Sequence, residues 1–275
     1  MNIKQLTRHY HVDEDLTGSV LAAIKKAKGG LSGLCADDLI PIDGFHIRGR
    51  KSTVEHAGLL EIKEQDRILD LGSGSGGTAR YLTSRFNCRV LGIDLTHSYA
   101  KLASRLAGLL QMADKTEFIC GNAAVLPFAA EGFDIVWSDH VQMNIPDKRG
   151  WTEEIRRVLK PGGKVAVHEV FTGPRGNPFL PGPWSSDPET SFMVKAEELK
   201  QIFTETGFSI IEWQDVTEIS SQWFQKMQAK RKAAPVSPLG IHLLMGPRAE
   251  EKMANMGKSL AEGYARVIMG VLQKS

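Results

Sequence analysis

Apolar segments alternate with helical patterns from about residue 65 onward, and this alternation limits the possible folds more than any other feature of the sequence. Continuous apolar strands that are separated by helices are typical of a parallel sheet covered on both faces. Right-handed crossovers between such strands predict a doubly wound α/β fold. The first five expected strands are residues 67–71, 88–94, 116–120, 133–138 and 164–170.

The remaining segments follow from the same reasoning. A sixth strand is expected at 208–216, and a last strand at 266–273 is expected to run antiparallel at the sheet edge. The sequence KPGG at 160–163 predicts a helix stop and a tight turn, and Pro and Gly make 172–188 and 235–247 irregular. Helices are expected at 17–28, 76–86, 97–112, 123–127, 148–160, 195–206, 219–232 and 248–262.

Composition narrows the classes of partner. The net charge of the 275 residues is only +2, so no nucleic-acid partner is expected, and the basic run at 226–232 is interpreted as a solvated helix face. No apolar run approaches the length of a membrane span, so no membrane partner is expected. Cys35, Cys88 and Cys120 stand far apart, which argues against a disulfide framework and against a metal site. Together with a polar N-terminus that lacks the apolar core of a signal peptide, this favours a reducing, cytoplasmic location.

The stretch DRILDLGSGSGGTARYL at 66–82 reads as a strand, a glycine-rich turn and a helix. Gly72, Gly74 and Gly77 satisfy the G-x-G-x-x-G spacing, and with Ser73 they would bring backbone N–H groups close to a ligand. In open α/β sheets, ligands bind outside the carboxyl ends of the strands. Asp94 ends the second strand 20 residues after Gly74 and could accept both hydroxyls of an adenosine ribose. Both NAD and S-adenosylmethionine (SAM) carry that ribose, so Asp94 does not decide between them.

Asp70 discriminates between these ligands. It lies two residues before Gly72, where a carboxylate would repel a pyrophosphate. The same carboxylate would favour the ammonium group of a methionine moiety and the nearby sulfonium. A Walker-type phosphate loop is excluded because no Gly-Lys-Ser/Thr follows the glycines. The turn therefore favours SAM over NAD.

Five motifs in order over about residues 65–215 resemble those of class I SAM-dependent methyltransferases. They are ILDLGSGSGG, GIDLT, GNAAVLPF, FDIVWSDHVQMNIPDK and EIRRVLKPGGKVAVHEV. The resemblance implies a Rossmann-like sheet of strand order 3-2-1-4-5-7-6. It implies that Leu95 accompanies Asp94 at the ribose and that Asn122 and Ala123 flank the adenine. The family usually has Asp where Asn122 stands, but an amide carbonyl can accept the same hydrogen bond.

Within that class the layout is similar to the sarcosine/dimethylglycine N-methyltransferases and the quinone C-methyltransferases. The ending NMGKSLAEGYARVIMGVLQKS resembles that of the former group. The expected activity is methyl transfer from SAM to a small molecule, with an amine favoured and O, C or S acceptors open. The alternatives are a non-catalytic SAM-binding regulatory protein and a macromolecule methyltransferase. Neither N-P-P-Y nor D-P-P-Y follows the fourth strand, and no Pro-Cys pair occurs, which disfavours the latter.

The loop after the fourth strand, SDHVQMN, is the expected centre of the chemistry. His140 is proposed as a general base, and His168 at the end of the fifth strand as a second catalytic candidate. Strand alternation means that His168 and Glu169 do not both face the same cleft. Ser138 is assigned to the cofactor, and Gln142 and Asn144 to the acceptor, where each residue could instead be structural.

The two ends of the chain are expected to cover this edge of the sheet. In DGFHIRGR (43–50), Arg48 is assigned to the cofactor and His46 to the acceptor, and Tyr10 could close over the SAM. Trp184 is assigned to the acceptor pocket, and Trp223 and Phe224 are further candidates for it. A homodimer is considered possible. The expected organisation is a helical lid segment at 1–55, a SAM-binding core at 56–216, a helical insertion over the acceptor at 217–265 and the last strand at 266–275.

Overall fold

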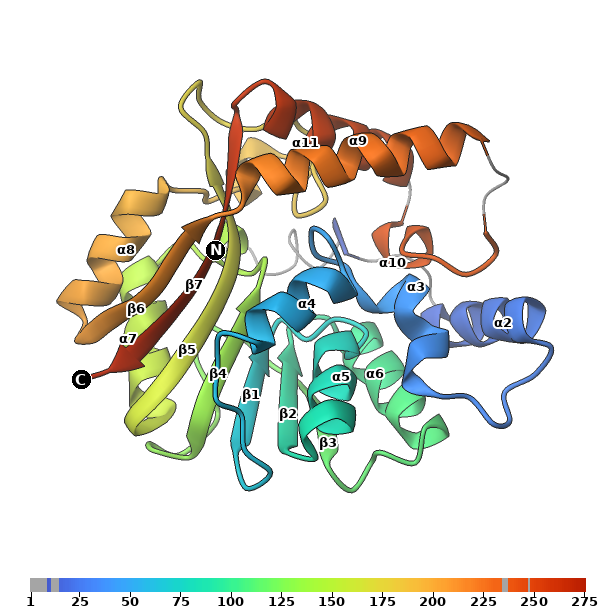
Figure 1. Cartoon of the computed structure of the whole chain (residues 1–275), viewed down its shortest axis with the longest axis horizontal. Helices are drawn as coiled ribbons and strands as arrows, with labels where there is room; N and C mark the ends of the chain where they lie inside the picture. Colours follow the sequence, from blue (N-terminus) through green and yellow to red (C-terminus); the bar gives the residue numbers. More distant parts are fainter. Residues whose placement is uncertain (1–8, 11–14, 234–236, 247) are drawn as a thin grey trace.

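The computed structural model describes residues 9–10, 15–233, 237–246 and 248–275, and its centre is a seven-stranded sheet (Figure 1). The strand order is β3-β2-β1-β4-β5-β7-β6, which confirms the order that the resemblance implied. The strands are β1 (Arg67–Leu71), β2 (Arg89–Asp94), β3 (Thr116–Cys120), β4 (Phe133–Asp139), β5 (Leu159–Thr172), β6 (Phe208–Asp215) and β7 (Ala265–Lys274).

Strand directions also agree with the sequence analysis. The strands β1 to β5 pair in parallel, whereas β7 runs antiparallel to both β5 and β6. β5 begins earlier than predicted, because Leu159 already pairs with Phe133 and the turn at 160–163 lies inside the strand. The seven predicted strands are therefore present, and the disagreement is confined to their ends.

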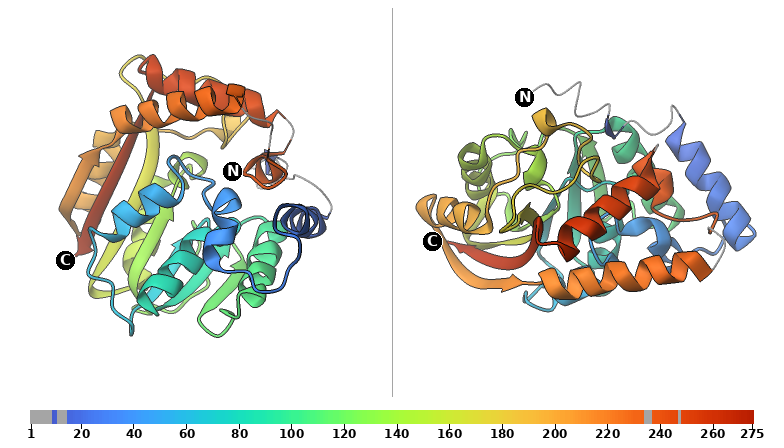
Figure 2. Two further views of the ribbon diagram at one scale, coloured as in Figure 1. Left: turned by 45° about the vertical axis from the view of Figure 1, so that its right-hand side comes forward. Right: turned by 90° about the horizontal axis from the view of Figure 1, so that it is seen from above.

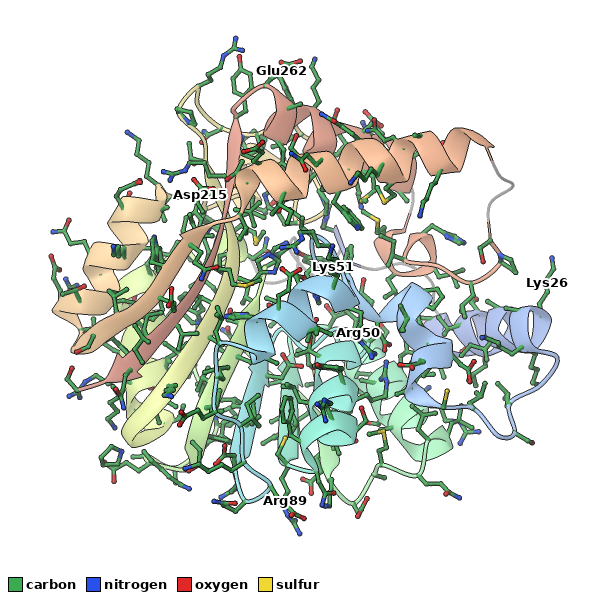
Figure 3. All side chains as sticks on the ribbon, in the orientation of Figure 1. Lys26, Arg50, Lys51, Arg89, Asp215 and Glu262 are labelled. Carbon is green, nitrogen blue, oxygen red and sulfur yellow. The ribbon has the colours of Figure 1, made fainter. Side chains whose placement is uncertain are left out.

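Helices cover both faces of the sheet, which explains why its strands are apolar on both sides. On one face, α4 (Arg50–Ala57) and α5 (Gly77–Phe86) pack over Ile68 and Trp137. On the other face, α7 (Lys148–Val158) and α8 (Ala196–Glu205) pack over Leu69 and Val165. The helix α6 (His97–Leu109) packs on β2 and β3. Charged side chains such as Lys26, Arg89 and Glu262 point away from the body (Figure 3).

One predicted helix is absent from its expected place. Residues 123–127 form a turn, in which the side-chain oxygen of Asn122 accepts a hydrogen bond from the Ala124 N–H at 2.9 Å. An Asn side chain that bonds the backbone two residues onward competes with helix formation. The prediction of a helix at 123–127 was therefore wrong.

The C-terminal helices form a lid, a name used here for α9 (Thr217–Ala233), α10 (His242–Met245) and α11 (Ala249–Ala261). Figure 2 shows α9 and α11 side by side across one edge of the sheet, and they are the two lid helices in closest mutual contact. Residues 235–247 were expected to be irregular, so α10 was missed. It is only four residues long, too short for a helical period to be seen.

The N-terminal section packs against α6. Its helix α2 (Leu16–Lys28) confirms the prediction near 17–28, and it buries Leu16, Val20 and Ile24 against Leu102 and Leu106. The short elements η1 (Ala36–Leu39) and α3 (Ile40–Asp43) follow and lead the chain to α4. In the part of the chain that the structure describes, no helix is long and apolar enough to cross a membrane.

Candidate active site

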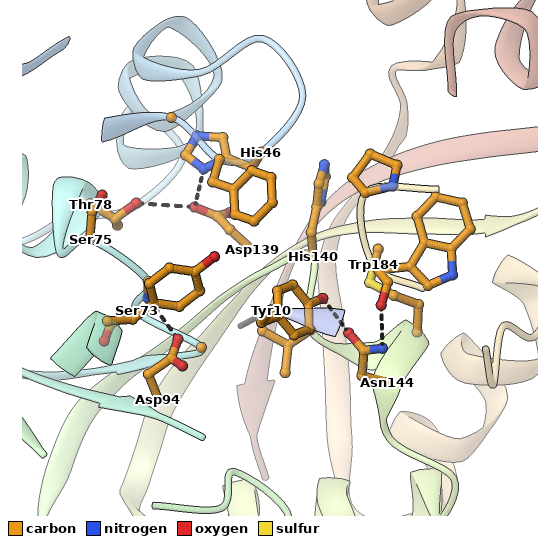
Figure 4. Close-up of a pocket in the computed structure, with 18 of the residues that line it drawn as sticks. Tyr10, His46, Ser73, Ser75, Thr78, Asp94, Asp139, His140, Asn144 and Trp184 are labelled. Carbon is orange, nitrogen blue, oxygen red and sulfur yellow. Dashed lines mark hydrogen bonds and ion pairs between the residues drawn. The ribbon is translucent and has the colours of Figure 1, made fainter. Parts of the chain in front are cut away.

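A pocket opens at the carboxyl edge of the central strands, beneath the lid (Figure 4). Its walls come from the glycine-rich turn, the ends of β2 and β4, residues 43–47 and the lid helices. This is the position predicted from the sequence for a ligand of an open α/β sheet. Two halves of different chemistry can be distinguished. We call them the cofactor half (Asp70, Gly72–Ser75, Ile93–Thr96, Asn122, Ala123) and the acceptor half (Met143, Val170, Trp184, Trp223, Phe224, Ile241, Met245, Met253, Met256).

The glycine-rich turn brings bare backbone to the pocket. Gly72 and Gly74 have φ angles of 62° and 53°, a region that favours glycine. A Cβ atom on Gly72 would also lie 2.6 Å from a methyl carbon of Val141. The turn therefore needs glycine for conformation and for the close approach of the loop after β4.

Asp94 links this turn to the end of β2. Its two carboxylate oxygens accept hydrogen bonds from the N–H groups of Gly74 at 2.9 Å and Thr96 at 2.8 Å. Burial raises the pKa of the Asp94 carboxyl, and the two N–H donors oppose that shift. Each oxygen keeps a further lone pair, so the side chain can still accept from ligand hydroxyls.

Asp70 is buried in the cofactor half, and its Oδ2 atom has no hydrogen-bond partner among the described residues. Burial raises its pKa well above the usual range, and the charges of Asp139 and Asp94 raise it further, against Arg80. Arg80 is itself fully buried and bonded to Asp43. A buried carboxylate oxygen without a partner is costly, and a cationic ligand group would satisfy it. This half of the pocket thus fits the ammonium end of SAM.

The residues expected at the ribose and adenine also line the pocket. They are Leu95, expected at the ribose, and Asn122 and Ala123, expected at the adenine. The Asn122 oxygen is already bonded to the Ala124 N–H, although it retains a second lone pair. The structure thus brings the predicted ribose and adenine residues together on one wall.

His140 lines the pocket, but its ring is committed to the protein. The Ile47 N–H donates to Nε2 at 2.9 Å, and Nδ1 lies 2.7 Å from the carbonyl oxygen of His168. A carbonyl only accepts, so Nδ1 carries the proton and Nε2 spends its lone pair on Ile47. Burial lowers the pKa of His140 to about 4, with His46 contributing. In this geometry neither ring nitrogen is free to take a proton, and His140 docks the 44–49 loop; its role as a general base stays a prediction.

Two further predicted residues lie behind the pocket wall. His168 is buried, and neither of its ring nitrogens has a hydrogen-bond partner among the described residues. Ser138 donates to the Oε1 atom of Glu169 at 2.6 Å. Neither residue lines the pocket, so the structure does not place His168 or Ser138 where the sequence analysis expected them. Glu169 also accepts from the N–H groups of Val141 and Gln142, and thereby fixes the loop after β4.

Gln142 and Arg48 are likewise turned away from the pocket. The Gln142 amide donates to the Val170 carbonyl, and Arg48 is bonded to Glu55 at the surface of α4. Neither side chain is part of the pocket lining. The structure therefore does not place Gln142 at the acceptor or Arg48 at the cofactor, where the sequence analysis expected them.

Tyr10, Asn144 and Trp184 form a connected group at the acceptor half (Figure 4). The Tyr10 hydroxyl donates to the Asn144 Oδ1 atom at 2.8 Å, and Asn144 Nδ2 donates to the Trp184 carbonyl at 3.0 Å. Nearby, His9 lies 2.9 Å from the Pro183 carbonyl through Nε2. Residues 9–10 are thus fastened across the pocket to the loops that carry Asn144 and Trp184.

Asp139 is a pocket residue that the sequence analysis did not assign. Its Oδ2 atom accepts from Trp137 Nε1 at 2.8 Å and from the Thr78 hydroxyl at 3.2 Å, and lies 3.6 Å from His46 Nδ1. Strand alternation is the sequence feature that could have identified it, because it places Asp139 on the same face as Trp137 and opposite to Ser138. His46, which was predicted, lines the pocket beside it.

The acceptor half is apolar. Four methionines line it, Met143 from the loop after β4 and Met245, Met253 and Met256 from the lid. Trp184, Trp223 and Phe224 complete its surface, and Trp223 and Phe224 meet edge to face. The lid therefore presents its apolar side to the pocket, and flexible methionines allow the wall to fit an irregular apolar ligand.

Sequence and structure comparisons identify the class of this fold. Residues 69–167 match the profile of a methyltransferase domain. The glycine-rich turn, Asp94 and the loop after β4 all fall inside that range. Residues 69–167 therefore match a methyltransferase domain, which confirms the resemblance to SAM-dependent methyltransferases.

Individual proteins of this class are similar over parts of the chain. It is 36% identical over 124 residues to the chloroplastic tocopherol O-methyltransferase of Arabidopsis thaliana, covering 44% of this chain and 36% of that protein. It is 30% identical over 181 residues to the glycine/sarcosine/dimethylglycine N-methyltransferase of Actinopolyspora halophila, covering 65% and 32%. The chain thus spans about a third of the length of these relatives.

A solved structure shares the fold across the whole chain. It is phosphoethanolamine N-methyltransferase 2 of Haemonchus contortus in complex with SAM, with a TM-score of 0.72 and 20% identity. The superposition covers 100% of this chain and 60% of that chain. At this identity the likeness establishes the fold.

Proposed function

We propose that the protein transfers a methyl group from SAM to an apolar small-molecule acceptor. The observation that carries the proposal is a single pocket in which a glycine-rich, carboxylate-lined half meets an apolar half built by the lid. The carboxylates suit a cationic cofactor, and the apolar half suits a molecule that buries most of its surface. The methyltransferase domain supports the same reaction class.

The cofactor half supplies binding and orientation. When bound, SAM supplies an electrophilic methyl group on a sulfonium. Asp94 and Leu95 would hold the ribose, the turn at Gly72–Gly74 would lie against the methionine portion, and Asp70 would accept from the ammonium group. Asn122 and Ala123 would flank the adenine. The orphaned Oδ2 atom of Asp70 supports this assignment, because it lacks a partner within the protein.

The acceptor half selects an uncharged or cationic apolar body. Among the described residues that line the pocket there is no Lys or Arg, so a phosphate group would have no cationic partner there. A phosphorylated acceptor would require such a cationic partner, so this pocket does not suit one. The reacting atom can be oxygen, carbon, sulfur or an uncharged nitrogen, and the preference for an amine stays a prediction.

The acceptor half also disfavours the two alternative functions. A regulatory SAM-binding protein would not need a second, apolar half beside the cofactor. A macromolecule would have to pass the lid helices and the Tyr10–Asn144 bond, both of which lie at the pocket. Alignment of the acceptor and exclusion of water are then the main contributions of the protein, since both ring nitrogens of His140 are bonded within the protein.

The segment assignments and the location belong to the same proposal. The described parts of 1–55 and 217–265 roof the acceptor over the core at 56–216, supported by Tyr10, Phe45, Phe224 and Met256 in the pocket wall, and the rest of these two segments lies outside the described residues. The free thiols of Cys35, Cys88 and Cys120 support a cytoplasmic location. The possible homodimer stays a prediction.

The test is a calorimetric and enzymatic comparison. Purified protein should bind SAM and S-adenosylhomocysteine but not NAD. It should release S-adenosylhomocysteine with lipophilic phenols, amines or alkenes and not with phosphoethanolamine. Comparable affinity for NAD, or turnover confined to phosphorylated acceptors, would contradict the proposal.

A further inference from the structure

Asp70 and Asp139 lie on neighbouring parallel strands at the edge where the pocket opens. In the register of β1 and β4, Asp70 pairs with Trp137, and Asp139 lies two residues beyond Trp137. Side chains alternate along a strand with a period of two, so the two carboxylates share one face of the sheet. Both side chains line the pocket.

Among the residues that the structure describes, no Lys or Arg side chain forms an ion pair with either carboxylate. Arg80, the cation that acts on Asp70, is already bonded to Asp43 and to the Ser75 carbonyl. The donors to Asp139 are the neutral groups of Trp137 and Thr78. The histidine nitrogens near Asp139 lie at 3.6 Å (His46) and 3.8 Å (His168), beyond ordinary hydrogen-bond distance.

Each carboxylate keeps one oxygen for a ligand. Asp70 Oδ2 is buried without a partner, and Asp139 Oδ1 accepts no hydrogen bond from the residues that the structure describes. The charge of Asp139 is the largest electrostatic contribution to the raised pKa of Asp70, which reflects the proximity of the two groups. Two adjacent carboxylates of this kind are stabilised by a cation that contacts both.

We propose that Asp139 and Asp70 together bind the ammonium group of the methionine portion of SAM. Asp139 is then a second anionic anchor for the cofactor, and it does not act on the acceptor. An ammonium group has three N–H donors, enough for one bond to each carboxylate and one to a backbone carbonyl. The inference rests on the proposed function, because it takes SAM as the ligand of this half of the pocket.

The experiment compares three ligands by calorimetry in the Asp139→Asn variant. SAM and S-adenosylhomocysteine carry the ammonium group, whereas 5′-methylthioadenosine lacks the amino-acid portion. An Asn oxygen can still accept from Trp137, so the variant removes charge with little change of shape. We expect SAM and S-adenosylhomocysteine to bind roughly 10- to 100-fold more weakly, and methylthioadenosine to bind within about twofold of wild type. Asp114→Asn, at an exposed position outside the pocket, is the matched control.

Other outcomes would overturn the inference. Unchanged SAM affinity would do so, and so would an equal loss for all three ligands, which is the mark of a structural role. Unchanged SAM affinity with a lower kcat and an altered pH–rate profile would place Asp139 at the acceptor. If wild-type protein binds neither SAM nor S-adenosylhomocysteine, the proposed function itself fails, which is a distinct result.

A measurement on the wild-type protein removes dependence on folding of the variant. The desamino analogue of S-adenosylhomocysteine keeps every group except the ammonium. We expect wild type to bind this analogue at least 10-fold more weakly than S-adenosylhomocysteine. Equal affinity for the two would contradict the ammonium site.

Discussion

The two halves of the pocket recognise ligands by different physical means. The cofactor half is built from positive-φ glycines and short polar side chains, whose atoms are fixed by backbone hydrogen bonds such as Gly74 N–H to Asp94. The acceptor half is built from methionine and aromatic side chains, most of them on the lid, with few polar atoms. A rigid polar wall selects one ligand by directed bonds, whereas a soft apolar wall selects by size and by exclusion of water.

This difference sets how substitutions in each half should behave. Loss of one directed bond in the cofactor half leaves a buried polar group unpaired, which is costly. Loss of one apolar contact in the acceptor half weakens binding in proportion to the apolar surface newly exposed to water. Flexible methionine side chains can fill part of the resulting space. Cofactor affinity and acceptor affinity should therefore respond separately.

The largest expected effect is at Asp94. Asp94→Ala removes an acceptor for the ribose hydroxyls and also the partner of the Gly74 and Thr96 N–H groups. We expect SAM affinity to fall by ~2–4 kcal/mol, or roughly 30- to 700-fold, measured by calorimetry. Glu117→Ala, at an exposed position on β3, is the control. Binding within threefold of wild type would show that Asp94 does not hold the ribose.

The cofactor half was largely predictable from the sequence, for a physical reason. Its function depends on backbone conformation and on spacing along the chain, so Gly72, Gly74 and Asp94 can be recognised without knowledge of the fold. Strand order followed from the motifs, and the seven strands appear in their expected places. Residues 123–127 do not form the expected helix because the Asn122 side-chain oxygen accepts a hydrogen bond from the Ala124 N–H. Helix propensities do not record such a bond.

The orientation of individual polar side chains was predicted less well than the glycine-rich turn, because it depends on bonds to other parts of the chain. His140 looked like a base from its position, but its ring is bonded to Ile47 and to the His168 carbonyl, 93 and 28 residues away. Arg48 was assigned from its place in a turn, yet it bonds Glu55 on α4. Tertiary partners of this kind leave no periodic trace in the sequence.

His140 lies between the two halves, and its role can be tested through pH. Its pKa falls from 6.5 to about 4 in the folded protein, so the unfolded chain binds the proton first as pH decreases. Folding stability should therefore drop as pH falls from about 6.5 toward 4. Between pH 7 and pH 5 we expect this one group to account for about 2 kcal/mol of lost unfolding free energy, measured by urea denaturation.

The matched variant for this measurement is His140→Asn, because Asn tolerates the positive φ of 59° at this position. The pH dependence of its stability should be smaller than that of wild type by about the same amount. Its kcat should fall through a displaced 44–49 loop, without loss of a bell-shaped limb near pH 6.5 in the pH–rate profile. Disappearance of such a limb in the variant would restore His140 as a general base.

A smaller effect is expected from the lid. Trp223→Ala removes a partly buried indole ring that lines the acceptor half and meets Phe224 edge to face. We expect the KM for an apolar acceptor to rise about 10-fold, or ~1.4 kcal/mol, because the acceptor loses apolar contact surface. SAM affinity should stay within about twofold. A parallel loss of SAM affinity would mean that cofactor binding and acceptor binding are coupled.

The smallest expected effect is at Tyr10, where the N-terminal residues reach the pocket. Tyr10→Phe keeps the ring against Phe45 and Tyr99 but removes the hydroxyl that donates to Asn144 Oδ1 at 2.8 Å. One neutral hydrogen bond is worth about 1 kcal/mol, so the acceptor KM should rise by roughly fivefold while SAM affinity changes little. Steady-state kinetics at saturating SAM would measure this, with Tyr81→Phe outside the pocket as the control. If kcat falls 100-fold or more with KM unchanged, the Tyr10 hydroxyl takes part in the reaction, and the acceptor half contains a polar catalytic group that its apolar lining conceals.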